Sequence, residues 1–387
     1  MGGFPYLGRM NPKFYLLLLT SALSAFFCRG NDGAFKVNGN HLVPMYETDI
    51  TVQKEILTIH RIGKMQAQIT VYYEFFNPKQ EKTMEVGFEA FSPYGDADRT
   101  VSKSGQPYIS KFTVNLNGVA VPWQVTLVKD KSYYREGKYR TISLAEANKE
   151  ADEEGPPDFF YVYHFRALFH NGVNILQHTY VVDLSSSITE TYSLQYVLTA
   201  AKRWGNRQID DFTLQIDMGD YQDLSISETF FKHASEWTMT GPGKQIERDA
   251  EYGDKKEPGV SQFFVHKGML VYKKTNFKPA GELYLNAVNA YYYYTTSTGK
   301  HQGDGPFKFD YRIDDLPFSV DAGYPLDAAD ELSKKIVRNL PFARRGYVFK
   351  SAEIQAYYER QPWYIRDPGY TPVVGELTAE EQKLLKE

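Results

Sequence analysis

A stretch near the end of the chain carries the residue types that could bind an anionic ligand. It runs from residue 339 to residue 364 and is written NLPFARRGYVFKSAEIQAYYERQPWY. Eight basic residues lie between Lys334 and Arg366, against two acidic residues, Glu353 and Glu359. Guanidinium groups bind carboxylates and phosphates in two-point contacts, and aromatic rings offer faces for stacking. This basic-aromatic stretch is therefore a candidate binding site.

Two interpretations of the basic-aromatic stretch are open. In the first, its aromatic residues form the core of a small domain, and the charges only solvate that core. In the second, the charges form a rim that contacts a partner. Both can hold together, with the glycine and the aromatic residues inside and the arginines outside. The candidate ligand-binding residues are Arg338, Arg344, Arg345, Lys350, Arg360, Trp363 and Tyr364.

Histidines elsewhere in the chain do not form a metal-binding pattern. His164, His170 and His178 are six and eight residues apart, a spacing unlike the close pairs of common zinc sites. The single cysteine, Cys28, lies near the N-terminus. We interpret the histidines as ordinary surface or rim residues, and we predict neither a metal site nor a cofactor.

Patterns typical of catalysis are incomplete. The Gly-Lys pairs within residues 241–245 and 297–303 lack the upstream glycine and the downstream Ser/Thr of a phosphate-binding loop, so we interpret them as turns. The chain contains no Gly-x-Ser-x-Gly sequence. A tyrosine-rich run at residues 291–296 fits a strand, with a carbohydrate platform as the alternative. No catalytic residue is predicted.

The first thirty residues have the pattern of an export signal. Lys13 precedes an apolar run from Phe14 to Phe27, which is short for a membrane span, and small residues follow. We predict a signal peptide at residues 1–30 with cleavage near Gly30, and an uncleaved anchor is the alternative. Lipidation of Cys28 is left open. After this segment the sequence has no second hydrophobic segment, so the mature body should be soluble.

Composition excludes one class of partner. The chain has 387 residues and a formal net charge of −4, whereas a general nucleic-acid binder needs a strong basic excess. Its 30 tyrosines and 25 phenylalanines favour strands. A chain of this length can form two or three domains, and its oligomeric state is not predicted.

From about residue 45 to residue 295 the dominant hydrophobic period is two. In MQAQITVYYEF, which begins at Met65, and in DFTLQIDM, which begins at Asp211, apolar residues alternate with mostly polar ones. Such alternation predicts strands with one buried face and one wet face. Asn117-Gly118 supplies the left-handed conformations of a two-residue hairpin turn. Many strands of this kind, separated by turn signals, predict an antiparallel β-sandwich architecture.

The segment at residues 129–157 differs in character from the strands around it. Ser143 and Glu146 have the spacing of a capping box, and a strongly acidic run follows. We interpret the segment as an excursion with a surface helix, or as a linker between β domains at residues 31–128 and 158–324. The predicted fold is mainly β, with one or two antiparallel β-sandwich domains and then a small helical C-terminal domain.

The helical domain is expected at residues 325–387. In LDAADELSKKIVRNLP the apolar residues recur every three or four positions, and Pro341 is predicted to end this helix. Ser351 can cap a second short helix. Thr378 and Glu381 form a capping box that predicts a third.

The same C-terminal segment resembles the YARHG domain, a short module of exported bacterial proteins. The residues that carry the resemblance are Arg338-Asn339, Phe342-Ala343-Arg344, Gly346-Tyr347, Phe349-Lys350-Ser351 and Trp363-Tyr364. The resemblance implies an extracytoplasmic location and a cell-wall binding role. The β region is similar to exported bacterial proteins over residues 31–59 and 196–216, which implies the same compartment.

Two positions depart from the family's name motif. Phe342 stands where the motif has tyrosine, and Arg345 stands where it has histidine. An Arg-His-Gly string invites comparison with phosphohistidine phosphatases, whose nucleophile is that histidine. With Arg345 in its place, that chemistry is impossible here.

The sequence therefore predicts an exported bacterial envelope protein of the periplasm or cell surface. Its predicted function is non-catalytic binding of an anionic envelope component such as peptidoglycan through the basic-aromatic stretch. One alternative is an envelope glycan hydrolase that uses carboxylates of the β region. A second alternative is a scaffold that binds another envelope protein at an exposed edge strand.

Overall fold

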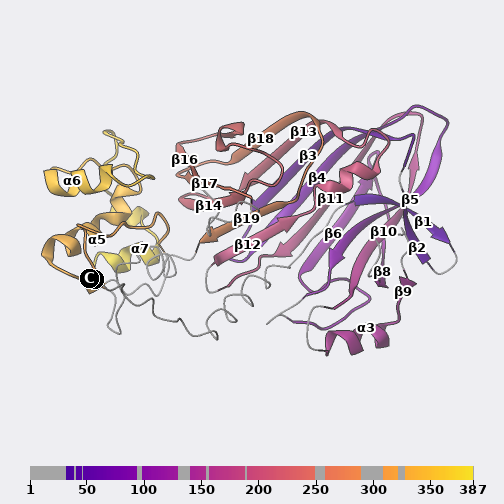
Figure 1. The fold of residues 1–387 in the computed structure, drawn as a ribbon, viewed down its shortest axis with the longest axis horizontal. Helices are drawn as coiled ribbons and strands as arrows, with labels where there is room; N and C mark the ends of the chain where they lie inside the picture. The colour runs from indigo at the N-terminus through magenta and orange to yellow at the C-terminus, as the bar shows by residue number, and fades with distance from the viewer. Residues whose placement is uncertain are drawn as a thin grey trace, which may run out of the picture.

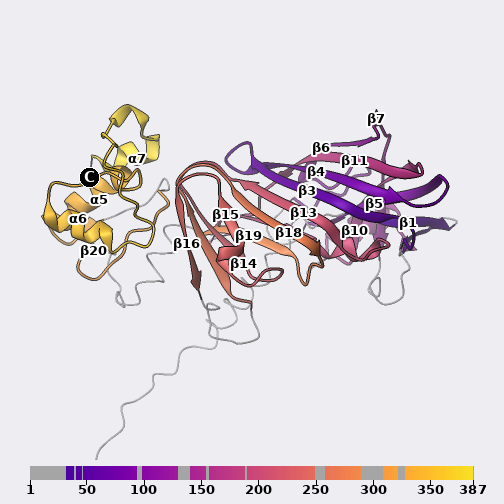
Figure 2. The same ribbon diagram turned by 90° about the horizontal axis from the view of Figure 1, so that it is seen from above.

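The computed structural model describes residues 32–38, 41–45, 47–93, 98–129, 140–153, 157–187, 190–248, 258–288, 308–320 and 327–386. The expected signal peptide at residues 1–30 and the tyrosine-rich run at residues 291–296 lie outside the described residues. An elongated β body and a small helical unit lie end to end along the longest axis of the molecule (Figures 1 and 2).

An eight-stranded sheet runs through the β body. In sheet order its strands are β15 (Trp237–Met239), β18 (Leu270–Phe277), β13 (Ile209–Asp217), β3 (Thr51–Arg61), β4 (Gln66–Asn77), β11 (Gly172–Asp183), β6 (Ile109–Leu116) and β7 (Val119–Ala120). Neighbouring strands of this sheet are antiparallel, apart from β13 and β3, which pair in parallel. The prediction of antiparallel sheets thus missed one central parallel pair.

Two smaller sheets complete the body. The six-stranded sheet has the order β2 (His41–Met45), β1 (Asp32–Asn38), β5 (Lys82–Phe91), β10 (Phe159–Phe169), β8 (Gln124–Lys129) and β9 (Arg140–Thr141). The five-stranded sheet has the order β12 (Glu190–Tyr196), β19 (Leu283–Val288), β14 (Gln222–Ser227), β17 (Val260–Val265) and β16 (Gly243–Arg248). The two sheets lie at opposite ends of the eight-stranded sheet (Figure 1). Two short 3-10 turns, η1 (Thr199–Arg203) and η2 (Ala234–Glu236), connect strands.

Alternation along the strands builds one continuous apolar core. Ala67, Ile69 and Val71 on β4 are fully buried, and so are Phe212 and Leu214 on β13, as their spacing predicts. Ring contacts join the sheets face to face: Phe88 of the six-stranded sheet meets β11, and Phe263 of the five-stranded sheet meets β15. The core therefore follows from the period of two.

The predicted hairpin and one of the three histidines behave as expected. Asn117 and Gly118 have φ angles of 52° and 84° and connect β6 to β7. His170 is exposed, with 58% of its side chain accessible. The interpretation of His178 as a surface or rim residue was wrong, because it lies on the inner face of β11 and is fully buried among aromatic rings. The ring of half-buried His164 donates from Nδ1 to the carboxylate of Glu85, and its Nε2 forms a hydrogen bond with the hydroxyl of Thr126.

Strands from the ranges 31–128 and 158–324 do not form separate sheets. β10, from the second range, lies between β5 and β8, from the first. The segment 129–157 contributes the edge strand β9 and the helix α3 (Leu144–Ala151), whose N-cap side chain at Ser143 accepts from the backbone N–H of Glu146. This segment is therefore an excursion from a single β body.

The helical unit contains α5 (Glu331–Ala343), α6 (Ala352–Glu359), the turn η3 (Val374–Glu376) and α7 (Ala379–Leu384). Short strands β20 (Lys308–Phe309) and β21 (Asp327–Ala328) pair beside them. Asp330 caps α5 by accepting from the N–H of Ser333, and Thr378 forms the predicted capping box with Glu381. The predicted end of α5 at Pro341 was wrong. Proline removes only its own N–H, and the N–H of Arg344 still donates to Leu340.

The core of the helical unit begins before the expected boundary at residue 325. Phe309, Leu316 and Phe318 pack with Trp363 and the other buried residues of the helices. Phe264 of β17 belongs to the same cluster, so the helical unit is packed against the five-stranded sheet of the body. Within the described part of the chain, none of the helices has the length and apolar character needed to cross a bilayer.

Candidate binding cleft between the β body and the helical unit

The two arginines of the basic-aromatic stretch are buried rather than exposed. Only 7% of each side chain is accessible at Arg344 and Arg345, and both bind the carboxylate of Glu381, which is 1% accessible. Glu381 comes from α7, whereas the arginines follow α5. The expectation that the arginines stay outside was therefore wrong, because a carboxylate far along the chain neutralises them inside.

Arg345 uses the geometry that distinguishes arginine from histidine. Its Nη1 donates to one carboxylate oxygen of Glu381 at 2.8 Å and its Nη2 to the other at 2.9 Å. An imidazole cannot make this two-point contact. At this position, where the family's name motif has histidine, Arg345 thus forms a two-point ion pair with Glu381 of α7.

The arginine pair also binds the β body. Nη2 of Arg344 donates to the backbone carbonyl of Tyr221 at 3.1 Å. Both guanidinium groups lie over the ring of Tyr221, 5.1 Å and 4.7 Å from its centroid for Arg344 and Arg345. Tyr221 directly precedes β14. We call Tyr221, Arg344, Arg345 and Glu381 the arginine clasp, since together they fasten the helical unit to the body.

Trp363 and Tyr364 are core residues, with 1% and 4% of their surface accessible. The indole N–H of Trp363 donates to the carbonyl of Leu316 at 2.9 Å, and the hydroxyl of Tyr364 donates to that of Tyr347 at 2.7 Å. Their rings are therefore not available to stack on a polymer at the surface.

Three other candidates remain closer to solvent. Lys350 and Arg360 are exposed, and Arg338 is half-buried on α5. Nη2 of Arg360 donates to the backbone carbonyl of Tyr311 at 3.0 Å. A ligand-binding role for these three stays a prediction.

A second docking contact involves His266, directly after β17. Its Nε2 lies 2.9 Å from the carbonyl of Trp363, so this nitrogen carries the proton and donates. The ring also packs on Phe318 at 4.9 Å between centroids. Burial lowers the pKa of His266, with the charge of Arg344 adding to the effect. The imidazole is therefore held neutral at the junction.

Acidification is expected to weaken this junction in a window set by His266. Because its pKa in the folded protein lies below the ordinary value of about 6.5, the stabilisation is complete above that pH and is lost as the pH falls through the lowered pKa. Denaturation at a series of pH values from 7.5 to 5 measures the loss. In His266→Gln, which keeps a donor for the carbonyl of Trp363, the free energy of unfolding should no longer fall with pH in this window. If it falls as steeply as in the unmodified protein, other titrating groups cause the pH dependence.

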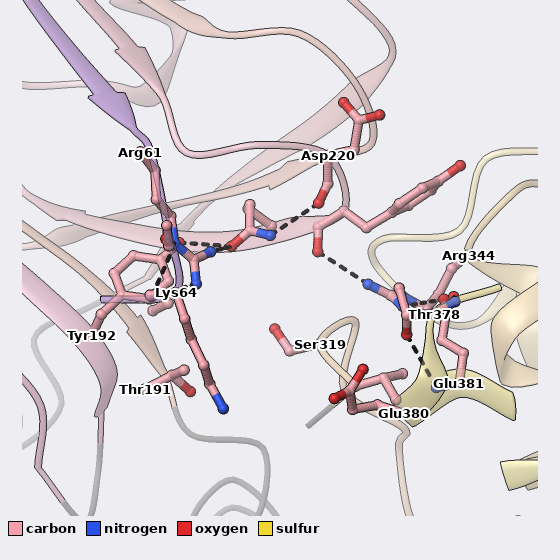
Figure 3. Close-up of a pocket in the computed structure, with 15 residues that line it drawn as sticks. Arg61, Lys64, Thr191, Tyr192, Asp220, Ser319, Arg344, Thr378, Glu380 and Glu381 are labelled. Atoms are coloured by element: carbon pink, nitrogen blue, oxygen red, sulfur yellow. Dashed lines mark hydrogen bonds and ion pairs between the residues drawn. The ribbon is translucent and has the colours of Figure 1, made fainter. Parts of the chain in front are cut away.

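A cleft of about 440 Å³ opens beside the arginine clasp, between the β body and the helical unit (Figure 3). From the body come the turn between β3 and β4, part of β12 and the residues around the start of β14. From the other side come Ser319, Arg344 and the first turn of α7. Small-molecule sites have volumes of this order and often lie at such junctions.

The body wall of the cleft is held rigidly. The guanidinium of Arg61 donates to the carbonyls of Gly63 and Lys64, which fixes the β3–β4 turn. It also donates to Gln222 at 3.1 Å and lies 4.5 Å from the ring centroid of Tyr192. The backbone that presents Lys64 is therefore fixed, while its side chain is exposed.

Three polar groups that face the cleft have no hydrogen bond or ion pair among the described residues. They are the ammonium of Lys64, the hydroxyl of Ser319 and the carboxylate of Glu380. Figure 3 shows Lys64 reaching in from the body wall and Glu380 lying on the opposite wall, with Ser319 between them. Sequence reasoning missed all three, because they belong to turns and a helix start without any motif. No group of three or more metal-ligating side chains occurs in the part of the chain that the structure describes.

Comparison with known proteins identifies the C-terminal region. Residues 321–387 match the family model of the YARHG domain. Among curated proteins, none matches the sequence. A solved structure from Legionella pneumophila, of a protein provisionally named as nutrient binding, is 16% identical, covers 89% of this chain and 94% of its own, and has a TM-score of 0.47.

An M1 zinc metallopeptidase from Deinococcus radiodurans shows a weaker likeness. It is 8% identical with a TM-score of 0.22, and the match covers 62% of this chain and 43% of the peptidase. The family match, in contrast, falls on the segment that carries Arg344, Gly346 and Trp363. The C-terminal unit of this chain is therefore a YARHG domain, fastened by its own arginine pair to a mainly β body.

Proposed function

We propose that this protein is an exported, non-catalytic envelope protein that holds a polar envelope component, such as a fragment of peptidoglycan, in the cleft beside the arginine clasp. The observation that carries the proposal is the cleft itself, because its two walls come from different units and present polar groups that have no partner among the described residues. A YARHG domain supports the envelope location, since the family is known from exported bacterial proteins.

The cleft is a better site than the basic-aromatic surface. Of the seven residues predicted from the sequence, the two adjacent arginines neutralise Glu381 and the two aromatic residues fill the core. Of the seven predicted residues, an anionic polymer at the surface would therefore meet only Arg338, Lys350 and Arg360. A ligand in the cleft would instead pair with Lys64, Ser319 and Glu380, which no other residue in the described ranges pairs with.

Blocking the cleft tests the proposal. Ser319→Trp places an indole where Figure 3 shows a small side chain facing the cavity, whereas Ser319→Ala keeps the volume. We expect the full chain to co-sediment with purified peptidoglycan, Ser319→Ala to bind more weakly because it loses only the hydroxyl, and Ser319→Trp to lose most binding because the indole fills the cavity. If binding is lost in Lys350→Ala/Arg360→Ala and not in Ser319→Trp, the ligand binds at the basic-aromatic surface and the cleft proposal is wrong. Failure of the unmodified protein to bind would refute the function.

One observation supports a hydrolase as the second candidate. Asp220 and Glu380 both line the cleft, and glycan hydrolysis uses two carboxylates on either side of the scissile bond. The discriminating measurement is the release of reducing ends from peptidoglycan. We expect none; release that disappears in Glu380→Gln would assign the protein as an enzyme.

A further inference from the structure

We propose that the ligand of the cleft is zwitterionic, a short peptide or amino acid with a free amine and a free carboxylate. This inference rests on the proposed function and names the chemistry that the site selects.

Opposite charges on opposite walls carry the argument. Lys64 enters from the β3–β4 turn of the body, and Glu380 enters from the first turn of α7 in the YARHG domain. Neither forms an ion pair with the other or with another described residue, although both line one cavity. A ligand carboxylate beside Lys64 and a ligand ammonium beside Glu380 would complete both pairs.

Three other charged groups around the cavity, Arg61, Arg344 and Glu381, are already engaged. Arg61 is held by the turn carbonyls, Gln222 and the ring of Tyr192. Arg344 and Glu381 neutralise each other within the arginine clasp. Asp220 also lines the cleft and forms no ion pair among the described residues, but Figure 3 shows its carboxylate pointing away from Lys64 and Glu380. The charges that face each other across the cleft are thus one cation and one anion, a pattern that matches a zwitterion better than a polyanion.

The volume of the cavity and the hydroxyl of Ser319 between its walls both agree with this ligand. About 440 Å³ accommodates a small molecule rather than a polymer strand. Ser319, half-buried between the two walls, offers a hydroxyl that can donate to or accept from a peptide bond. The arginine clasp and the hydrogen bonds of Arg61 to the β3–β4 turn fix the backbone of the two walls, so the two segments that carry the charges are in place before a ligand binds.

The test uses the full chain and three probes: alanyl-alanine, its N-acetyl derivative and its C-terminal amide. Binding is measured by calorimetry for the unmodified protein, for Lys64→Met and for Glu380→Gln. Lys350→Met is the matched control, since it removes the same charge outside the cleft. We expect the unmodified protein to bind the free dipeptide about tenfold more tightly than either derivative.

Each variant should remove one kind of discrimination. Glu380→Gln should bind the free dipeptide and its N-acetyl derivative equally, and Lys64→Met should no longer distinguish the dipeptide from its amide. Equal affinity of the unmodified protein for all three probes overturns the zwitterion proposal. If no dipeptide binds while Ser319→Trp still abolishes peptidoglycan binding, the ligand chemistry is refuted and the cleft function stands.

Discussion

Replacing Glu381 by alanine is expected to destabilise the helical unit by about 3–5 kcal/mol. The substitution leaves the guanidinium groups of Arg344 and Arg345 buried without their counter-charge, which is the costly way to break a buried ion pair. It also removes the acceptor for the N–H of Thr378 at the start of α7, a cap worth about 1 kcal/mol. Chemical denaturation and hydrogen exchange over residues 327–386 measure the loss.

The neighbouring residue provides the control. Glu380 lies in the same turn of α7 but forms no hydrogen bond or ion pair with a described residue, so Glu380→Ala should cost less than about 1 kcal/mol. If the two alanine variants lose similar stability, the arginine clasp does not hold the unit in place. Replacing Arg344, Arg345 and Glu381 together by methionine tests the same point differently, because an apolar replacement of a whole buried ion cluster can be close to neutral.

The clasp also predicts a response to strong acid. Burial acts to raise the pKa of Glu381, but the hydrogen bond from Arg345 and the charge of Arg344 outweigh it, and the net pKa is lowered. The stabilisation is therefore complete above the unfolded pKa of about 4.3 and is lost as the pH falls through the lowered value. The loss from Glu381 therefore begins at about pH 4.3, whereas the loss from His266 begins at about pH 6.5, so the His266 contribution is the first to change as a pH series descends.

Gly346→Ala is expected to cost about 2–4 kcal/mol in the free energy of unfolding. Gly346 has a φ angle of +87°, in the left-handed region that disfavours any side chain. A Cβ at this position would lie 2.6 Å from the carbonyl oxygen of Ile365 and 2.9 Å from the backbone nitrogen of Asp367. The same nitrogen donates to the carbonyl of Gly346 at 2.8 Å, so the two segments cannot separate without losing that bond.

Gly375→Ala is the matched control in the same unit. A Cβ there meets nothing within 4 Å, and its backbone does not adopt a positive φ. We expect a change within about 0.5 kcal/mol for this variant. If the two substitutions lower the free energy of unfolding equally, the positive φ and the close backbone approach at Gly346 do not explain why glycine follows the arginine pair.

Local sequence patterns determined the parts of this protein that depend on neighbouring residues. The period of two along β4 and β13 predicted their buried faces, and Asn117-Gly118 predicted the hairpin. The capping pair at the start of α7 was predicted in the same way. The family likeness placed the C-terminal unit, because its motif residues are close together in the chain.

Tertiary structure alone decided what depends on distant residues. Glu381 lies 37 positions after Arg344, and Tyr221 lies 123 positions before it, so the sequence around the arginines could not show that they are buried. In the same way β10 pairs with β5 and β8, so one sheet contains strands from both ranges that the sequence left open as one or two domains. The cleft also depends on both units, since Lys64 and Glu380 line one cavity only because the helical unit packs against the β body. Hydrophobic period reports on the faces of single elements, whereas the pairing of charges follows from how those elements pack.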